Sequence, residues 1–76
     1  MPRTNQPRTV AFKAPDGKLV QIVPYDWGKT WIGALVVAGQ CEGGEFIARS
    51  LNDWDVEIRH FARRRPDLKP LEIPAG

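Results

Sequence analysis

One cluster of side chains in the sequence is suited to recognition, a run of basic residues near position 60. Its members are Arg59, His60, Arg63 and Arg64. Arginine guanidinium groups donate paired hydrogen bonds to carboxylates and phosphates. On a helix, Val56 projects between these side chains, so the pattern indicates a small outward surface of cations around one apolar residue. Trp27 stands beside a turn glycine and completes the predicted partner-binding set.

A purely structural interpretation of the same arginines stays open. Cations in the last turn of a helix stabilise the negative end of its dipole. Asp55 and Arg59 also have the i,i+4 spacing of an ordinary exposed ion pair. The cluster therefore indicates either a binding surface or a well-terminated helix.

A second basic set precedes position 30 and is interleaved with aromatic residues. Residues 1–38 hold five basic and two acidic residues, whereas residues 39–76 hold six and seven. Lysine and arginine bind phosphates and aromatic rings stack on bases, so this half favours a nucleic-acid-binding sheet face and arm. Alternatively, the lysines protect strand edges from aggregation while the tryptophans fill a small core. The candidate nucleic-acid-binding residues are Arg3, Arg8, Lys13, Lys18 and Lys29.

Residues that could perform covalent or metal chemistry are few. The chain has one cysteine, Cys41, and one histidine, His60, with no third group to orient a nucleophilic dyad. The triplet at residues 28–30 has the residue types that end a phosphate-binding loop, but Val23 stands where that motif requires glycine. We therefore expect a non-enzymatic protein without a cofactor, a metal centre or a small-molecule substrate.

Length and composition set the remaining bounds. The chain has 76 residues, of which 42% are hydrophobic and 26% charged, which is typical of one folded domain with a modest core. The net charge of +2 is too small to imply a nucleic-acid partner by itself. The lone cysteine favours a reducing compartment, and residues 31–38 are far short of the roughly 20 apolar residues of a membrane span. We expect an unexported, cytoplasmic protein without membrane association.

The helix that carries the basic cluster has marked ends. Ser50 and Asp53 have the spacing of a capping box, with aspartate in place of the usual glutamate. The apolar residues after this cap recur at steps of three and four and predict one buried stripe. These residues are Leu51, Trp54, Ile58, Phe61 and Ala62.

The segments before the helix predict strands. Residues 9–14 and 19–23 alternate in hydrophobicity around a Pro-Asp-Gly turn, which is typical of a hairpin with a bulge. Pro24 ends the second strand or lies on an edge. Residues 30–38 favour a strand buried on both faces over a two-turn helix, while residues 39–44 predict a loop and residues 45–49 a fourth strand.

The predicted fold is an α+β domain in which an antiparallel sheet of three or four strands packs on one C-terminal amphipathic helix. Residues 1–8 predict a flexible basic arm, residues 9–66 the single domain, and residues 67–76 a proline-rich extended tail. Trp31 and Trp54 are expected in the core and Trp27 outside it.

Two functions follow from these observations. The leading hypothesis is a protein-interaction module that docks on a larger protein or nucleoprotein complex. Small size and scarce catalytic groups are typical of the inhibitor and adaptor proteins that phages and other mobile elements encode. The alternative is a nucleic-acid-binding domain that uses the basic sheet face and arm.

Overall fold

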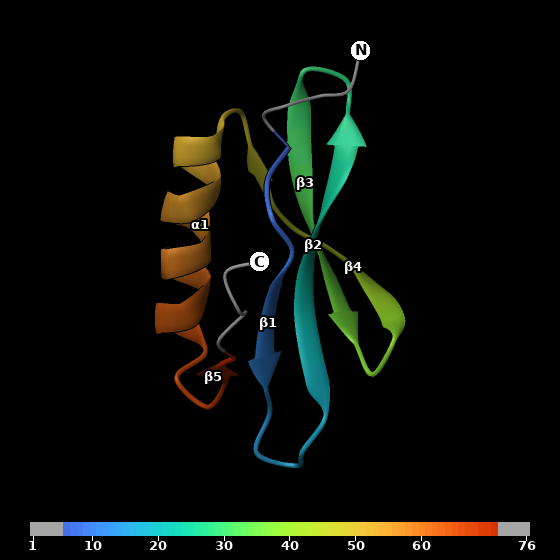
Figure 1. Cartoon of the computed structure of the whole chain (residues 1–76), viewed down its shortest axis with the longest axis vertical. Coiled ribbons are helices and arrows are strands. Elements are labelled where there is room, and N and C mark those ends of the chain that lie inside the picture. The colour runs from blue at the N-terminus through green and yellow to red at the C-terminus, as the bar shows by residue number, and fades with distance from the viewer. Residues whose placement is uncertain (1–5, 72–76) are drawn as a thin grey trace.

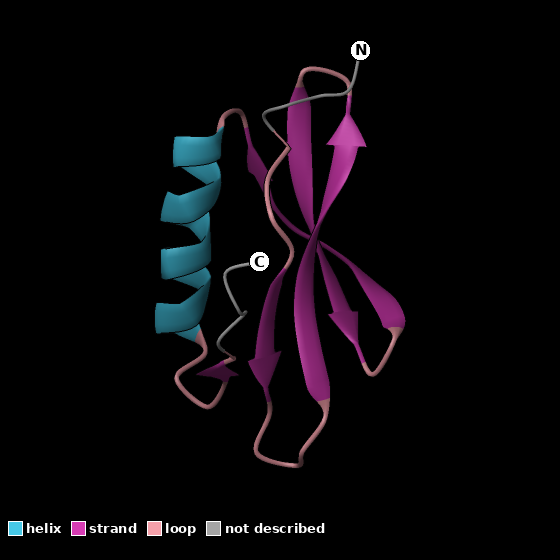
Figure 2. Cartoon of the chain, in the orientation of Figure 1, coloured by secondary structure: helices cyan, strands magenta, loops and turns pink. Residues whose placement is uncertain are grey.

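Five strands and one helix build two layers in the computed structural model, which describes residues 6–71. The strands are β1 (Val10–Lys13), β2 (Leu19–Trp27), β3 (Thr30–Val37), β4 (Gln40–Ala48) and β5 (Lys69–Pro70). They form one antiparallel sheet in the order β4-β3-β2-β1-β5. Helix α1 (Leu51–Arg64) lies along one side of this sheet (Figures 1 and 2). The predicted α+β class with a single C-terminal helix is confirmed.

The hairpin between β1 and β2 forms where the turn residues predict it. Gly17 has a φ of +88°, which glycine adopts without a steric penalty. Its N–H donates to the carbonyl of Ala14 at 2.9 Å, and the N–H of Lys18 donates to Oδ1 of Asp16 at 3.0 Å. These bonds close the predicted bulged turn and place Phe12 opposite Val20.

Strand β2 continues past Pro24. At this residue β2 has a partner strand on one side only. β1 pairs with β2 only as far as Ile22, so Pro24 has a strand neighbour on the β3 side alone. A proline there removes no ladder bond from β1. Of the two predictions for Pro24, the structure therefore supports the position on a strand edge and not the end of the strand.

Residues 30–37 form strand β3, as the sequence favours, but its fully buried residues, Trp31 and Gly33, lie on one face and not on both. The loop predicted at residues 39–44 is wrong. The connection to β4 is only Ala38 and Gly39, both with positive φ, at +51° and +83°. Such a two-residue turn matches the twist of the strands it joins. β4 therefore begins at Gln40 and includes two glycines that the sequence pattern assigned to a loop.

β4 accommodates those glycines through two irregularities. The pairing with β3 skips Glu42, between Cys41 and Gly43, and skips Glu45, between Gly44 and Phe46. Each skipped residue is the extra residue of a bulge, which bends the strand and increases its twist. The sheet consequently ends in a twisted edge strand that carries two glutamates.

The capping of α1 follows the predicted box with one difference. Oγ of Ser50 accepts a hydrogen bond from the N–H of Asp53 at 3.0 Å. The carboxylate of Asp53 reaches back to the N–H of Arg49, also at 3.0 Å, one residue further than in the usual box. The start of the helix is thereby fixed where the chain leaves β4.

The apolar stripe of α1 is confirmed except at Leu51. Trp54 and Phe61 are buried, and Ile58 and Ala62 pack against them, whereas Leu51 is 43% exposed. The stripe is centred on the two aromatic residues. At 100° per residue, Leu51 lies some 60–80° from that centre, in the first turn of the helix.

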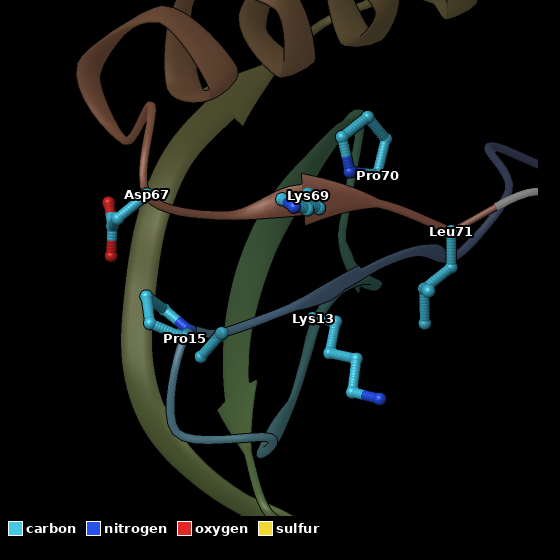
Figure 3. Close-up of a pocket in the computed structure, with 7 residues that line it drawn as sticks. Lys13, Pro15, Asp67, Lys69, Pro70 and Leu71 are labelled. Atoms are coloured by element: carbon cyan, nitrogen blue, oxygen red, sulfur yellow. The ribbon is translucent and has the colours of Figure 1, made fainter.

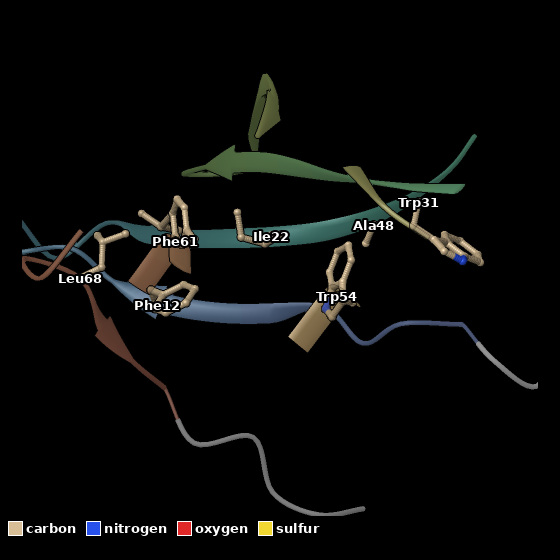
Figure 4. Packing of buried hydrophobic residues seen from close by; sticks show 8 residues of the cluster. Phe12, Ile22, Trp31, Ala48, Trp54, Phe61 and Leu68 are labelled. Atoms are coloured by element: carbon tan, nitrogen blue, oxygen red, sulfur yellow. The ribbon is translucent and has the colours of Figure 1, made fainter. Parts of the chain in front are cut away.

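The core fills the space between α1 and the sheet (Figure 4). The rings of Phe12 and Phe61 meet with centroids 5.5 Å apart, and Phe46 meets Trp54 edge-on at 5.1 Å. Tilted and edge-to-face arrangements are the favoured geometries of aromatic pairs. The buried hydrophobic residues are Phe12, Val20, Ile22, Trp31, Ala48, Trp54, Phe61 and Leu68.

The fold extends beyond residue 66. Arg65 ends the helix and donates its N–H to the carbonyl of Phe61, and Leu68 donates to the carbonyl of Arg65, both at 3.0 Å. Leu68 is buried, and β5 then pairs with the outer edge of β1. Within the described residues, the structure contains no helix with the length and apolar character needed to cross a membrane.

Candidate functional site

The outer side of α1 carries the predicted partner-binding cluster. Arg59, His60 and Arg63 are exposed, and Val56 is half-buried among them. Trp54 and Phe61, on the opposite side of the helix, point into the core. None of the three exposed basic residues makes an ion pair with another residue that the structure describes. The helix therefore presents two arginines and one histidine outward, around a single valine.

Two neighbouring arginines are already engaged. A guanidinium nitrogen of Arg64 lies 3.6 Å from Oε1 of Glu45, the residue in one bulge of β4. Arg65 donates two hydrogen bonds of 3.2 Å to the carboxylate of Asp67. The side-chain hydrogen bond from Arg65 lowers the pKa of Asp67, and the same bond raises the pKa of Arg65. Arg64 thus forms an ion pair between the helix and the sheet, which the sequence pattern did not reveal.

Trp27 lies apart from the basic end of the helix. It ends β2 at the turn to β3, whereas Arg63 and Arg64 occupy the last turn of α1, toward the opposite end of the molecule (Figure 1). Trp27 is 62% exposed, as predicted, and its ring centroid lies 6.3 Å from that of Tyr25. The structure therefore does not bring Trp27 together with the arginines into one surface.

The predicted nucleic-acid-binding residues are dispersed over the domain. Lys13 lies next to β5, and Lys18 lies at the β1–β2 turn, where its ammonium group is 3.8 Å from Asp16. Lys29 lies at the other end of the sheet, in the β2–β3 turn. Arg8 lines a groove beside the first turn of α1, and Arg3 lies outside the described residues.

A larger surface was missed by the sequence prediction, the side of the sheet that faces away from α1. Side chains alternate along strands, so the neighbours of the buried Ile22 and Trp31 point to this side. Tyr25 and Ile47 are 57% and 58% exposed there. We call this surface the open face; its apolar residues are Ala11, Leu19, Val23, Tyr25, Trp27, Ile32, Ala34, Val36 and Ile47.

The open face has a shallow hollow near the β4 edge. Ile32, Gly44 and Ile47 line it. Gly44 has no side chain, and a Cβ added there would lie 3.1 Å from Cγ2 of Ile32. The absence of this one side chain leaves Ile32 and Ile47 accessible from outside. The sequence signal for the face was the apolar character of residues 30–38 on both sides of the strand.

A further depression of about 500 Å³ lies where β5 meets the β1–β2 turn (Figure 3). Its lining combines Lys13, Lys69 and Asp67 with Pro15, Pro70 and Leu71. Lys13 and Lys69 are direct partners across the two strands, so both belong to the same side of the sheet. The depression is wide open and holds no buried polar group that could select a ligand.

The two residues considered for covalent chemistry lie far apart in the fold. Cys41 is exposed near the β3–β4 turn, and His60 is exposed on α1, across the molecule (Figure 1). No group of three or more histidine, cysteine or acidic side chains in the described part of the chain comes together to hold a metal ion.

Searches against protein-family models, curated proteins and solved structures find no match to this chain.

Proposed function

We propose that this chain is a non-enzymatic protein-interaction module, an inhibitor or adaptor that docks on an acidic surface of a larger protein through the outer side of α1. The observation that carries the proposal is the contrast among the arginines of one helix. Arg64 and Arg65 have acidic partners within the chain, whereas Arg59 and Arg63 are exposed without a described ion-pair partner. An exposed guanidinium group without an ion-pair partner can bind a carboxylate through two parallel hydrogen bonds.

The helix dipole accounts for only part of the cluster. Its stabilisation of cations falls off beyond the last turn. Arg63 and Arg64 occupy that turn, and Arg59 lies a full turn earlier. Since the dipole does not explain Arg59, and Val56 adds a half-buried apolar centre, a polar-rimmed docking surface is the better interpretation.

The proposed compartment is the reducing cytoplasm. Cys41 is the only cysteine, and it is exposed and unpaired. An exposed thiol of this kind persists best where glutathione and thioredoxin systems keep it reduced.

The test reverses the charge of the helix surface. The double variant Arg59→Glu and Arg63→Glu is compared with wild type in affinity capture, followed by affinity measurement with the purified captured protein. We expect a loss of affinity of at least about 100-fold, because both paired hydrogen bonds are lost and like charges then meet. Unchanged affinity would contradict the proposal.

The matched control is Lys18→Glu with Lys29→Glu, which changes the net charge equally but lies in the two turns of the sheet. Its affinity should stay within about threefold of wild type, because charges distant from a contact mainly change long-range steering. Equal losses in both double variants would show that net charge, and not the helix surface, determines binding.

Nucleic-acid binding is the second candidate, and one observation favours it. The exposed rings of Tyr25 and Trp27 stand side by side, and Lys29 follows two residues later. Exposed aromatic rings beside cations stack on unpaired bases. Titration with single-stranded and duplex DNA and RNA at about 50 and about 200 mM salt, followed by tryptophan fluorescence, tests it. Salt-sensitive quenching that is lost in Trp27→Leu would support this function.

A further inference from the structure

We infer that the open face is the interface of a homodimer, in which a second copy of this chain lays its own open face against the first. The inference does not depend on the proposed function, because α1 lies on the other side of the sheet. It starts from exposure. Tyr25, Trp27 and Ile47 each expose more than half of their surface, and Val23, Ile32 and Val36 are only partly covered.

The area of the face is close to what a stable dimer requires. The core of the sheet has four strands, and β2 and β3 are nine and eight residues long. With strands about 4.8 Å apart and about 3.3 Å of rise per residue, the flat area of the sheet is on the order of 500 Å². Projecting side chains add to this area. Stable interfaces begin at about 600 Å² per partner. The footprint of a face-to-face pair is therefore close to that size.

The two borders of the open face carry opposite charges, so two copies of the face can be complementary. Lys13 and Lys69 are strand partners at the β1–β5 border, and Glu42 lies in the bulge of β4, the strand at the opposite edge. All three lie in the half of the sheet that contains the β1–β2 and β3–β4 turns (Figure 1). A two-fold axis parallel to the strands places β4 of one copy over β1 and β5 of the other. The lysines of each copy then meet Glu42 of its mate.

Pairing through the β4 edge is a less suitable way to join two copies. Two bulges interrupt that strand, at Glu42 and Glu45, and Gly43 has a φ of +132°. Bulges and charges on an edge strand oppose the addition of another strand. The apolar face, and not the edge, is therefore the contact.

The chemistry of the face also favours protein over nucleic acid. Much of the face is aliphatic: Ile32 and Ile47 lie beside Tyr25 on the neighbouring strands, and Val36 lies nearer the β3–β4 turn. Aliphatic side chains do not stack on bases as aromatic rings do. They do pack well against the same side chains of another sheet, in the manner of a β-sandwich.

The experiment is sedimentation equilibrium of the 76-residue protein from about 1 to about 200 μM, where a dimer with micromolar affinity dissociates measurably. We expect the mass to rise from 8.6 kDa toward twice that value. Ile47→Lys should raise the dimer dissociation constant at least about 100-fold, because each copy then buries an unpaired cation. The matched control, Leu51→Lys, changes an exposed apolar residue on α1 and should leave the constant unchanged.

A second set of variants tests the arrangement without touching the apolar centre. Lys13→Glu with Lys69→Glu should weaken the dimer at least tenfold, and adding Glu42→Lys should restore most of the affinity, because the border charges are exchanged. A chain that stays monomeric at the highest concentration overturns the inference. So does a dimer that survives in folded Ile47→Lys, or a monomer whose Trp27 is quenched by a single-stranded oligonucleotide.

Discussion

The two faces of the same sheet differ in what covers them. On one face, Phe12 and Ile22 are buried in the same cluster as Trp54 and Phe61 of α1. On the other face, Val23, Ile32 and Ile47 continue the apolar surface, and no described element lies over them. Both faces carry apolar side chains, but the chain supplies one helix, which covers one face.

The difference separates the residues that hold the fold together from those available for contact. A sheet in a two-layer domain normally alternates apolar and polar residues, with the polar side in water. β3 departs from that rule because Ile32, Ala34 and Val36 are apolar as well as Trp31 and Leu35. The covered face accounts for stability, and the open face is left for association.

The largest expected contrast comes from truncating one residue on each face. Phe61→Ala removes a ring with no exposed surface and should lower the free energy of unfolding by about 3–5 kcal/mol. Ile47→Ala should change it by less than about 1 kcal/mol when measured at low concentration, because the side chain is already mostly in water. Urea denaturation of both variants makes the comparison; equal losses would contradict it.

Two glycines extend the comparison to the backbone. A Cβ added at Gly33, on the covered face, would lie 2.7 Å from two ring carbons of Phe46, and that ring is held against Trp54. Gly33→Ala should therefore destabilise the fold by about 1–3 kcal/mol. Gly44→Ala meets only a methyl of the half-exposed Ile32 and should shift stability by less than about 1 kcal/mol. Thermal unfolding of the two variants side by side would reveal a reversed order, which would contradict the assignment of faces.

The sequence predicted the covered face well because local signals define it. The spacing of Ser50 and Asp53, the Pro-Asp-Gly turn and the stripe around Trp54 and Phe61 each depend on a few neighbouring residues. The open face escaped prediction because an apolar run shows that both sides of a strand are hydrophobic, but not which side the chain can cover. That outcome depends on where α1 packs, which is a property of the whole fold.

The same limit explains the error in β4 and the ion pair of Arg64 that the sequence did not reveal. Gly43 and Gly44 have the composition of a loop, yet a two-residue turn at Ala38 and Gly39 brings them into the sheet as bulge neighbours. Arg64 has the pattern of an exposed binding residue, yet it lies beside Glu45. In both cases a tertiary partner decided the role of the residue.

Removing the N-cap of α1, the helix that covers one face of the sheet, should lower stability by an intermediate amount. Ser50→Ala removes the acceptor for the N–H of Asp53 and should cost about 1 kcal/mol of stability. Thr30→Ala removes a comparable exposed hydrogen bond, from its hydroxyl to the carbonyl of Trp27 in the β2–β3 turn, and should cost less than about 0.5 kcal/mol. Chemical denaturation distinguishes the two, and an equal loss would show that the cap does not anchor α1.

The smallest effect concerns the turn that returns the chain to the sheet. Because the hydrogen bond from Arg65 lowers the pKa of Asp67, this pair stabilises the fold above the unfolded pKa of the carboxyl group. The contribution is lost as pH falls through the lowered pKa. Asp67→Asn should therefore flatten the decline in stability between pH about 5 and about 2 slightly, while a parallel decline in wild type and variant would exclude a role for the pair.

Nuclear magnetic resonance on a mixture of isotope-labelled and unlabelled chains shows whether a second copy covers the open face. Isotope-filtered spectra detect only contacts between different copies. A dimer through the open face predicts intermolecular contacts from the methyl groups of Ile32 and Ile47 to open-face side chains of the other copy, with none from Ile58, which packs against the core from α1. A dimer whose intermolecular contacts arise only from α1, or a sample with no intermolecular contacts at about 1 mM, would contradict it.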